Sequence, residues 1–144
     1  MAGIKGKVDV KSLKQFQKKL EMLNDRQRQV WTEAAVKELA ARLLRKAIKR
    51  TPVGIYPAET GKKGGTLRRG WTVGNVRKQG DTYTIEVINP VEYAPYVEFG
   101  HRTPNHQGWV EGKFMLTVSE QELQKEAPII LMARLEQFIG GAFA

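Results

Sequence analysis

Residues 91–100 read Val-Glu-Tyr-Ala-Pro-Tyr-Val-Glu-Phe-Gly, a stretch that gathers three aromatic residues, two glutamates and one proline between two turn signals. Pro95 lacks a backbone hydrogen-bond donor and restricts the residue before it. We therefore expect Tyr93 and Tyr96 on a kinked, strand-like or single-turn element rather than on a regular helix. Aromatic side chains presented in this way are typical anchors of protein interfaces.

The residues that precede this stretch predict a β-hairpin. The first strand is expected to carry Leu67, Trp71 and Val73. The second strand is expected at 82–88, where apolar and polar residues alternate as in a strand with one buried face. Lys-Gln-Gly-Asp at 78–81 has the composition of a turn and joins the two strands.

Two helices are predicted before the hairpin. The first has Asp9 or Ser12 as its N-cap, and its apolar residues recur at helical spacing at Leu13, Phe16, Leu20 and Leu23. The second follows the break at 24–25 and ends near Arg50, because Pro52 restricts the residue before it. Its apolar stripe contains Trp31, Ala35, Leu39, Leu43 and Ala47.

A third helix is predicted near the C-terminus. Ser119 to Glu122 has capping-box spacing, although the helix can already begin near Phe114. Pro128 predicts a kink or a restart, and the glycines at 140–141 predict the end. The expected fold class is α+β, with two N-terminal helices and a C-terminal helix packed on a small antiparallel β-sheet.

Composition limits the possible classes of protein. A chain of 144 residues with 41% hydrophobic residues suits one domain, here 1–144, and we expect flexible loops near 51–66 and 101–112. No apolar run is long enough to span a membrane, and no hydrophobic signal segment begins the chain, so we expect no membrane contact and a cytoplasmic site of synthesis. There is no cysteine, which excludes a disulfide framework.

Charge is distributed unevenly along the chain. Residues 1–80 hold 20 Lys and Arg against 6 Asp and Glu, whereas residues 81–144 hold 4 against 9. A basic half joined to an acidic half suits head-to-tail contact between copies, the geometry that closes rings. The basic half is also compatible with nucleic-acid binding, or with simple solvated helix faces.

No motif for catalysis or cofactor binding is found. Gly-Lys-Lys-Gly-Gly-Thr at 61–66 lacks the Gly-Lys-Ser/Thr ending of a phosphate loop. His101 and His106 do not have the spacing of metal ligands, and Glu92 and Glu98 are interpreted as surface carboxylates without a partner for acid–base chemistry. We therefore expect no enzymatic activity, no cofactor and no metal.

Three blocks resemble the HK97 gp10-like family of tailed-bacteriophage proteins in their order and spacing. They are Lys-Arg-Thr-Pro-Val at 49–53, Thr-Leu-Arg-Arg-Gly at 66–70, and the aromatic stretch at 91–100. With the flanking helices, the resemblance covers roughly 13–138. The segments 54–65 and 102–113 are longer than in the family pattern.

The resemblance implies a structural virion protein, assembled in the host bacterial cytoplasm, that forms a ring of six or twelve copies at the neck or tail top. Its implied partners are copies of itself, the head-tail connector, and tail-terminator or tail-tube proteins, with possible passage of genomic DNA through the ring. The expected subunit or partner interface contains Arg68, Arg69, Tyr93, Tyr96, Glu98, Phe99 and Trp109.

Each of these residues also has an ordinary structural interpretation. Arg68 and Arg69 are expected at the entrance of the first strand, where one can reach a carboxylate such as Glu98 or both can protect a solvated edge. The aromatic residues can equally belong to the core. The alternative function is a small basic nucleic-acid-binding module, whose signature is a steep dependence on salt.

Overall fold

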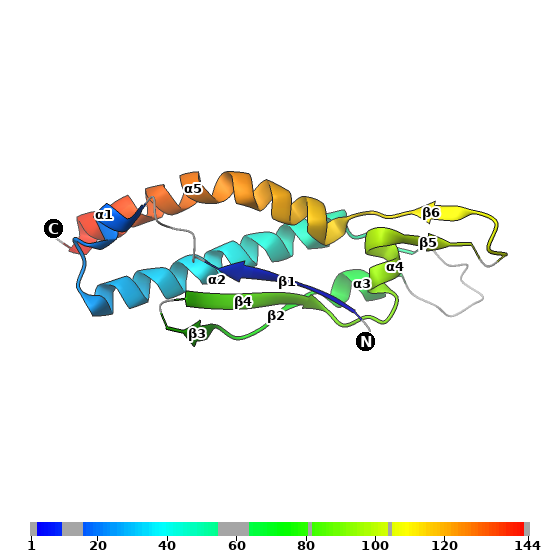
Figure 1. The fold of residues 1–144 in the computed structure, drawn as a ribbon, viewed down its shortest axis with the longest axis horizontal. Helices are drawn as coiled ribbons and strands as arrows, with labels where there is room; N and C mark the ends of the chain where they lie inside the picture. The colour runs from blue at the N-terminus through cyan, green and yellow to red at the C-terminus, as the bar shows by residue number, and fades with distance from the viewer. Residues whose placement is uncertain (1–2, 10–15, 55–63, 81, 104, 143–144) are drawn as a thin grey trace.

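The computed structural model, which describes residues 3–9, 16–54, 64–80, 82–103 and 105–142, places two long helices over one face of an antiparallel sheet (Figure 1). The helices are α1 Gln17–Leu20, α2 Asp25–Arg50, α3 Thr66–Arg69, α4 Ala94–Phe99 and α5 Met115–Ala142. The strands are β1 Ile4–Asp9, β2 Thr72–Val73, β3 Arg77–Gln79, β4 Thr82–Asn89, β5 Gly100–Arg102 and β6 Trp109–Glu111. The architecture is therefore broadly α+β, as predicted.

Helix α2 confirms the predicted second helix at both ends. Asn24 Oδ1 accepts a hydrogen bond from the Gln27 backbone N–H at 2.8 Å, and the Gln27 side chain accepts one from the Asn24 N–H at 3.0 Å. This reciprocal capping box satisfies two donors that a helix start otherwise leaves unpaired. Thr51 is the C-cap and is followed by Pro52, which cannot continue the helix.

The prediction for the N-terminus is wrong in part, because residues 4–9 form a strand. β1 pairs antiparallel with β4 along its whole length, from Ile4 opposite Asn89 to Asp9 opposite Thr84. Asp9 therefore ends a strand and does not cap a helix. The described helical segment that follows is only α1, while Ser12 and Leu13 lie outside the described residues.

The predicted hairpin is present, but its first strand is interrupted. β2 and β3 both pair antiparallel with β4, and the segment 74–76 between them leaves the ladder except for a hydrogen bond from Gly74 N–H to the Glu86 carbonyl. Lys78 and Gln79, which were predicted in the turn, lie in β3 opposite Tyr83 and Thr82. Leu67 belongs to α3 rather than to a strand.

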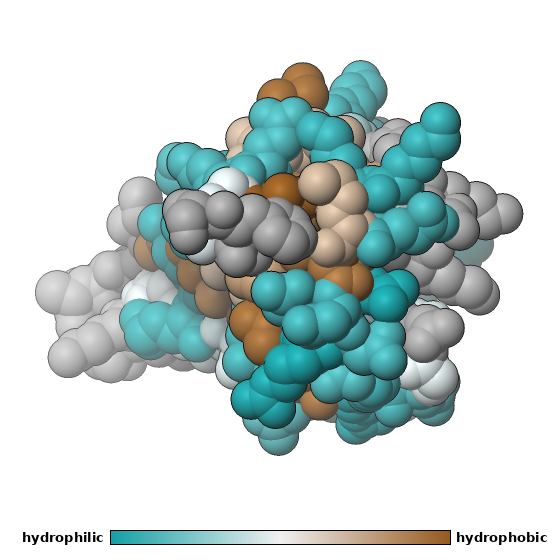
Figure 2. All heavy atoms as spheres, turned by 90° about the vertical axis from the view of Figure 1, so that its left-hand side faces the viewer, coloured by the Kyte–Doolittle hydropathy of each residue, from teal (hydrophilic) through white to brown (hydrophobic). Residues whose placement is uncertain are grey.

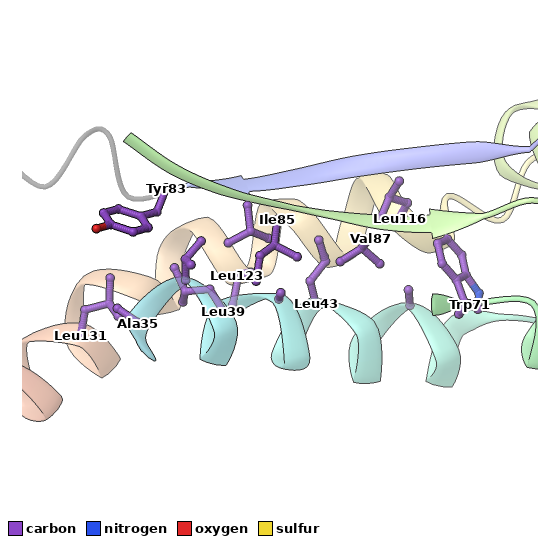
Figure 3. Close-up of a cluster of buried hydrophobic side chains, with 14 of the residues drawn as sticks. Ala35, Leu39, Leu43, Trp71, Tyr83, Ile85, Val87, Leu116, Leu123 and Leu131 are labelled. Atoms are coloured by element: carbon purple, nitrogen blue, oxygen red, sulfur yellow. The ribbon is translucent and has the colours of Figure 1, made fainter. Parts of the chain in front are cut away.

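The core lies between β4 and the two long helices (Figure 3). β4 alternates buried and half-buried residues, so Tyr83, Ile85 and Val87 face the helices. They meet a row of buried residues on α2 and α5 that includes Ala35, Leu39, Leu43, Leu116, Leu123 and Leu131. This burial explains why α2 keeps an apolar stripe every four residues.

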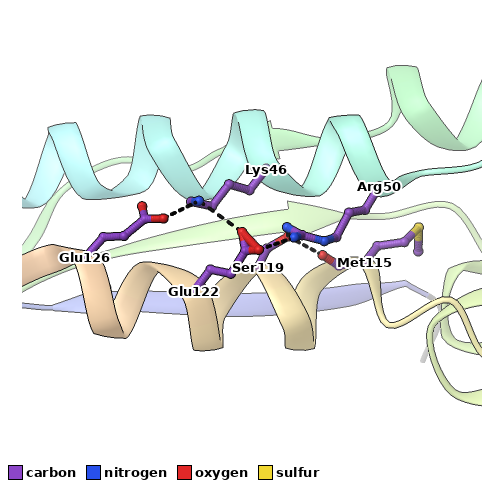
Figure 4. A network of polar contacts seen from close by, with 6 residues as sticks. All are labelled: Lys46, Arg50, Met115, Ser119, Glu122 and Glu126. Carbon is purple, nitrogen blue, oxygen red and sulfur yellow. Dashed lines mark hydrogen bonds and ion pairs between the residues drawn. The ribbon is translucent and has the colours of Figure 1, made fainter.

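A polar network joins the C-terminal half of α2 to α5 (Figure 4). Lys46 Nζ donates to Glu122 and Glu126 at 3.1 and 3.0 Å. Arg50 donates to Glu122 and, at 3.1 Å, to the Ser119 hydroxyl, which itself donates to the Met115 carbonyl. The prediction of a capping box at Ser119 is wrong, since this residue lies buried one turn inside α5.

Helix α5 begins at Met115, next to the earlier of the two predicted starts, Phe114. It continues through Pro128 without a restart. Pro128 has no N–H to donate to the Gln124 carbonyl four residues earlier. Both residues are exposed, so water can satisfy that carbonyl. The predicted end at 140–141 is wrong, because both glycines lie within the helix.

Candidate interaction surface

One end of the molecule is built from α4 and the β5–β6 hairpin, which extend beyond the ends of α2 and α5 (Figure 1). α4 has only six residues and carries Pro95 in its first turn, so of the kinked, strand-like and single-turn alternatives the structure shows a short helical one. Much of the segment near 101–112, which was predicted as a flexible polar loop, belongs to the two-stranded hairpin of β5 and β6. Of the other predicted loop, the part 55–63 lies outside the described residues.

The register of the hairpin places aromatic residues on both of its faces. Arg102 lies opposite Trp109, and His101 lies opposite Val110, so each pair shares one face. The Tyr96 ring packs edge-on against the His101 ring, with 6.1 Å between the ring centroids. The hairpin and α4 are therefore in contact through Tyr96 and His101, while Trp109 lies on the other face of the hairpin.

Two glycines permit the close contact between the hairpin and α4. Gly100 has φ of +90°, and a Cβ there would lie 2.5 Å from the Val110 carbonyl oxygen. A Cβ on Gly112 would lie 2.4 Å from the Glu98 carbonyl oxygen and 2.7 Å from the Phe99 carbonyl carbon. Backbone atoms occupy the space that a side chain at either position would need.

Substitution of Gly112 by alanine is expected to lower the free energy of unfolding by about 1–3 kcal/mol, the usual cost of forcing a methyl group into a packed site. Urea denaturation measures the change. Gly140→Ala is the matched control, because nothing lies within 4 Å of its added Cβ and alanine favours a helix. A Gly112→Ala protein as stable as the unsubstituted protein would contradict the contact described here.

Exposed aromatic and apolar side chains concentrate at this end. Six of the ten large hydrophobic residues that are exposed in the described part of the chain lie here, each between 39% and 58% exposed: Tyr93, Tyr96, Phe99, Trp109, Val110 and Phe114. We call these six residues the aromatic tip. At the opposite end, hydrophilic residues cover most of the visible surface, with hydrophobic side chains between them (Figure 2). A concentration of this kind on a protein surface marks an interaction site.

The backbone of the aromatic tip is held in a strained conformation. Phe114 has φ of 47°, which a bulky residue rarely adopts. Its N–H donates to the Glu98 carbonyl at 3.0 Å, and the Lys113 N–H donates to the Val97 carbonyl at 2.7 Å. Strain of this kind persists only where the surrounding structure fixes it and is common at functional sites.

The Glu98 side chain supports the tip from inside. It is 1% exposed, so its interpretation as a surface carboxylate is wrong. Its two carboxyl oxygens accept hydrogen bonds from the backbone N–H groups of Leu116 and Thr117 at 2.9 and 2.8 Å, and from the Thr117 hydroxyl at 2.6 Å. Glu98 therefore caps the first turn of α5, where a negative charge is favourable.

The structure brings together four of the seven predicted interface residues at the surface and separates the other three. Tyr93, Tyr96, Phe99 and Trp109 are exposed in the aromatic tip. Arg68 and Arg69 lie on α3, not on a strand, and donate to the backbone carbonyls of Thr51 and Gly64 rather than to Glu98. Sequence reasoning missed Val110 and Phe114, because their exposure follows from the tertiary structure and no local pattern marks it.

Comparison with known families gives one match. The family model described as "Bacteriophage HK97-gp10, putative tail-component" matches residues 14–100, which is more than half of the chain. The chain belongs to the HK97 gp10-like family. Neither the curated proteins nor the solved structures contained a match. The family gives this protein a structural role in the tail of a bacteriophage, and so a place in the virion.

The family match covers only part of the aromatic tip. It ends at Gly100, so it includes Tyr93, Tyr96 and Phe99 on α4 but neither the β6 strand nor Phe114. The HK97 gp10-like part of the chain therefore supplies α4, while the hairpin beyond it adds Trp109 and Val110 at the same end of the molecule.

Two glutamates on α5 have their pKa values shifted in opposite directions. Burial raises the pKa of Glu120, and the nearby charge of Glu98 raises it further. The hydrogen bond from Arg50 lowers the pKa of Glu122, and the one from Lys46 lowers it further. At neutral pH the folded state thus carries an unfavourable charge at Glu120 and a favourable one at Glu122.

Glu120→Gln is expected to raise, and Glu122→Gln to lower, the free energy of unfolding at pH 7. Because the pKa of Glu120 is raised in the folded state, its charge lowers the free energy of unfolding at pH values above that pKa. The gain in Glu120→Gln therefore disappears as the pH falls toward the ordinary 4.5. Because the pKa of Glu122 is lowered in the folded state, its charge raises the free energy of unfolding at pH values above 4.5. The loss in Glu122→Gln therefore disappears as the pH falls through the folded-state pKa of Glu122. Urea denaturation between pH 3 and 7 measures both, and changes of the same sign would contradict the assignment.

Other types of site find little support in the described part of the chain. No three His, Asp or Glu side chains lie together as potential metal ligands there. No helix in the ranges described combines the length and the apolar character needed to cross a membrane. A groove of about 530 Å³ lies between α2 and the segment that joins β2 to β3. Sequence reasoning did not predict this groove.

Proposed function

We propose that the protein completes the tail at its top and joins it to the head connector, as a ring of six or twelve identical subunits. One face of the ring meets the connector, and the other meets a tail-terminator or tail-tube protein. Genomic DNA passes through the centre, which suits the excess of Lys and Arg in residues 1–80. The role is structural, without catalysis and without a cofactor.

The observation that carries this proposal is the aromatic tip of an HK97 gp10-like protein. Six large apolar side chains lie exposed on a projecting element that glycines, strained backbone and a buried Glu98 hold in place. A concentration of exposed apolar side chains is typical of a surface that a partner covers. A projecting surface of this kind suits a ring subunit, because heterologous interfaces between identical subunits can close into rings.

Electron microscopy of particles from the source genome tests the proposal, with this gene deleted and with the gene restored in trans. Loss of a neck component is expected to yield filled heads and separate tails, or tails with defective tops, and restoration is expected to yield joined particles. Normally joined particles in the absence of the protein would overturn the proposed role at the neck.

A nucleic-acid-binding role is the second candidate, and unpaired cations on α2 favour it. Arg26, Arg45 and Lys49 are exposed, and none has a carboxylate within 4.0 Å among the described residues. Titration of purified protein with duplex DNA at several salt concentrations distinguishes the two roles. Tight binding at physiological salt, together with normal particles in the deletion, would favour the second role.

A further inference from the structure

The described residues from 24 to 80 carry a large excess of positive charge. They hold twelve Lys and Arg side chains against three carboxylates, those of Asp25, Glu33 and Glu38. Each of these carboxylates is already paired with a cation of α2, at nitrogen–oxygen distances of 2.8, 3.2 and 3.1 Å. The other nine cations therefore have no carboxylate partner within this part of the chain.

Six of these nine cations are exposed and without a charged partner. Lys46 and Arg50 are paired with glutamates of α5, and Lys78 Nζ lies 5.5 Å from the centroid of the Tyr83 ring. The remaining six have no carboxylate within 4.0 Å in the part of the chain that the structure describes, and we call them the basic side: Arg26, Arg45, Lys49, Arg68, Arg69 and Arg77.

The cations of α2 lie on the flank that adjoins β3. Arg45 and Lys49 follow Ala41 by one and two turns of α2, so these three residues share a flank. Ala41 lines the groove beside α2 together with Val76, and Arg77 is the next residue of that segment. The cations of α2 and of β3 therefore lie on the same side of the molecule.

Helix α3 continues this side at the C-terminal end of α2. The Arg68 side chain donates to the Thr51 carbonyl at 2.7 Å, and Trp71 Nε1 donates to the Thr51 hydroxyl at 2.6 Å. These bonds hold α3, with Arg69, beside the C-cap of α2, two residues after Lys49. In Figure 1, α3 lies at one end of α2 and β3 toward the other.

The length of the basic side suits duplex DNA. Arg26 lies seven residues before Glu33, which lines the groove, so this flank carries cations from the first turn of α2 to the last. From Arg26 to Lys49 an α-helix rises about 35 Å, close to one turn of the duplex. Exposed cations without fixed carboxylates can contact phosphates, and contacts of this kind let a protein slide along DNA.

The composition of the basic side favours a duplex over a protein or a single strand. Among the described residues from 24 to 80, Val30 and Val53 are the only large hydrophobic residues that are exposed. Protein interfaces are enriched in aromatic residues and depleted of lysine, and single-stranded nucleic acids stack their bases on exposed aromatic rings. A duplex presents its phosphates on the outside, so exposed charge is sufficient to bind it.

The other elements of the fold balance or reverse this charge. Residues 82–142 hold four Lys and Arg against eight carboxylates. On β1, Lys7 lies opposite Glu86, and Lys5 Nζ is 4.0 Å from the same carboxylate. The molecule therefore presents its uncompensated positive charge mainly along α2, α3 and β3.

We infer that the basic side faces the channel of the proposed ring and contacts the phosphate backbone of the duplex DNA that passes through it. This inference rests on the proposed ring and names the surface that the DNA meets. The contacts do not depend on base sequence, as the passage of a whole genome requires. The aromatic tip then serves protein contacts, while the more acidic α5 lies away from the DNA.

Binding of a fluorescent duplex by the purified full chain tests the surface. Arg45→Gln together with Lys49→Gln removes two exposed cations without breaking an ion pair of the described structure. Each phosphate contact contributes about 0.9 to the slope of log affinity against log salt concentration. The double variant is therefore expected to have a slope that is shallower by about two, with an unchanged melting temperature.

The matched control is Lys18→Gln together with Lys125→Gln, which makes the same change in net charge on α1 and α5. Both lysines are exposed and have no carboxylate within 4.0 Å in the described ranges, and the slope is expected to stay that of the unsubstituted protein. Equal slopes of the two double variants, or no binding of the unsubstituted protein at low salt, would overturn the inference. The ring would be unaffected, because the gene deletion tests it separately.

The same variants in particles distinguish DNA from a protein partner. Arg45→Gln with Lys49→Gln is expected to leave heads and tails joined in electron micrographs and to lower the number of plaques per joined particle. Separate heads and tails would make the basic side a protein interface and overturn the inference. A shallower slope, combined with normally joined particles in the gene deletion, would instead overturn the ring and assign the basic side to the second role.

Discussion

Replacement of Glu98 by alanine is expected to lower the free energy of unfolding by about 3 kcal/mol. The substitution removes three hydrogen bonds at the start of α5 and leaves the N–H groups of Leu116 and Thr117 without their partner. An unsatisfied buried donor costs about 1–3 kcal/mol, and bonds to a charged acceptor are stronger than those between neutral groups. Urea denaturation of the purified protein measures the change.

Glu92→Ala is the matched control, since this glutamate is exposed and lies on the same segment. Its expected effect is within about 0.5 kcal/mol, as for most surface substitutions. Glu98→Gln keeps the shape of the side chain and one acceptor oxygen, so its loss is expected to be intermediate. A Glu98→Ala protein as stable as Glu92→Ala would show that α5 is not held by this carboxylate.

Replacement of Tyr96 and Trp109 together by serine is expected to reduce the yield of joined, infectious particles by at least about 30-fold, without lowering the melting temperature. Both side chains are more than half exposed, so folding does not depend on them. In an assembled interface, a central aromatic residue contributes about 2 kcal/mol or more, which is a factor of roughly 30 in affinity. Plaque counts and electron microscopy of lysates measure the yield.

The control for this experiment is Ile129→Ser, which removes an apolar side chain that is even more exposed but lies on α5, outside the aromatic tip. Its expected effect on particle yield is small. Equal yields from the double variant and the control would mean that the aromatic tip is not an assembly surface. A fall in melting temperature would instead place Tyr96 or Trp109 in the fold.

The aromatic tip is joined to the rest of the fold through α4. Phe99 is exposed in the tip, while its neighbour Glu98 is buried and holds the first turn of α5. Phe99 and Glu98 thus lie on opposite sides of α4, one toward solvent and the other toward α5. Because α5 packs along α2 through the Lys46, Arg50 and Glu122 network, the tip is connected to both long helices.

Helix α2 was predictable because its signals are local. The break at Asn24, the apolar residues every four positions and Pro52 all lie within the helix or next to it. The hairpin of β4 was predictable for the same reason, since alternation and a short turn determine which residues face the core. The family resemblance rested on short blocks of adjacent residues, and the matched range confirms it.

β1 and the β5–β6 hairpin were not predicted, because neither is stable by itself. β1 contains Gly6 and two lysines, and it forms a strand only by pairing with β4, nearly eighty positions later. The hairpin depends on the tight approach of Gly112 to the carbonyl end of α4. Short strands of this kind obtain their stability from partners that a local pattern does not contain.

The sequence by itself determined α2, the strand β4 with its hairpin partner, and the family, and it singled out four aromatic residues of the tip without deciding whether they are exposed. Only the tertiary structure decided that Glu98 is buried, which of the two predicted starts of α5 is used, and that a groove lies beside α2. The physical reason is the reach of the interactions. Helix periodicity and turn chemistry act over a few residues, whereas the Glu98 carboxylate meets its partners 18 and 19 positions later, and the groove joins segments from both halves of the chain.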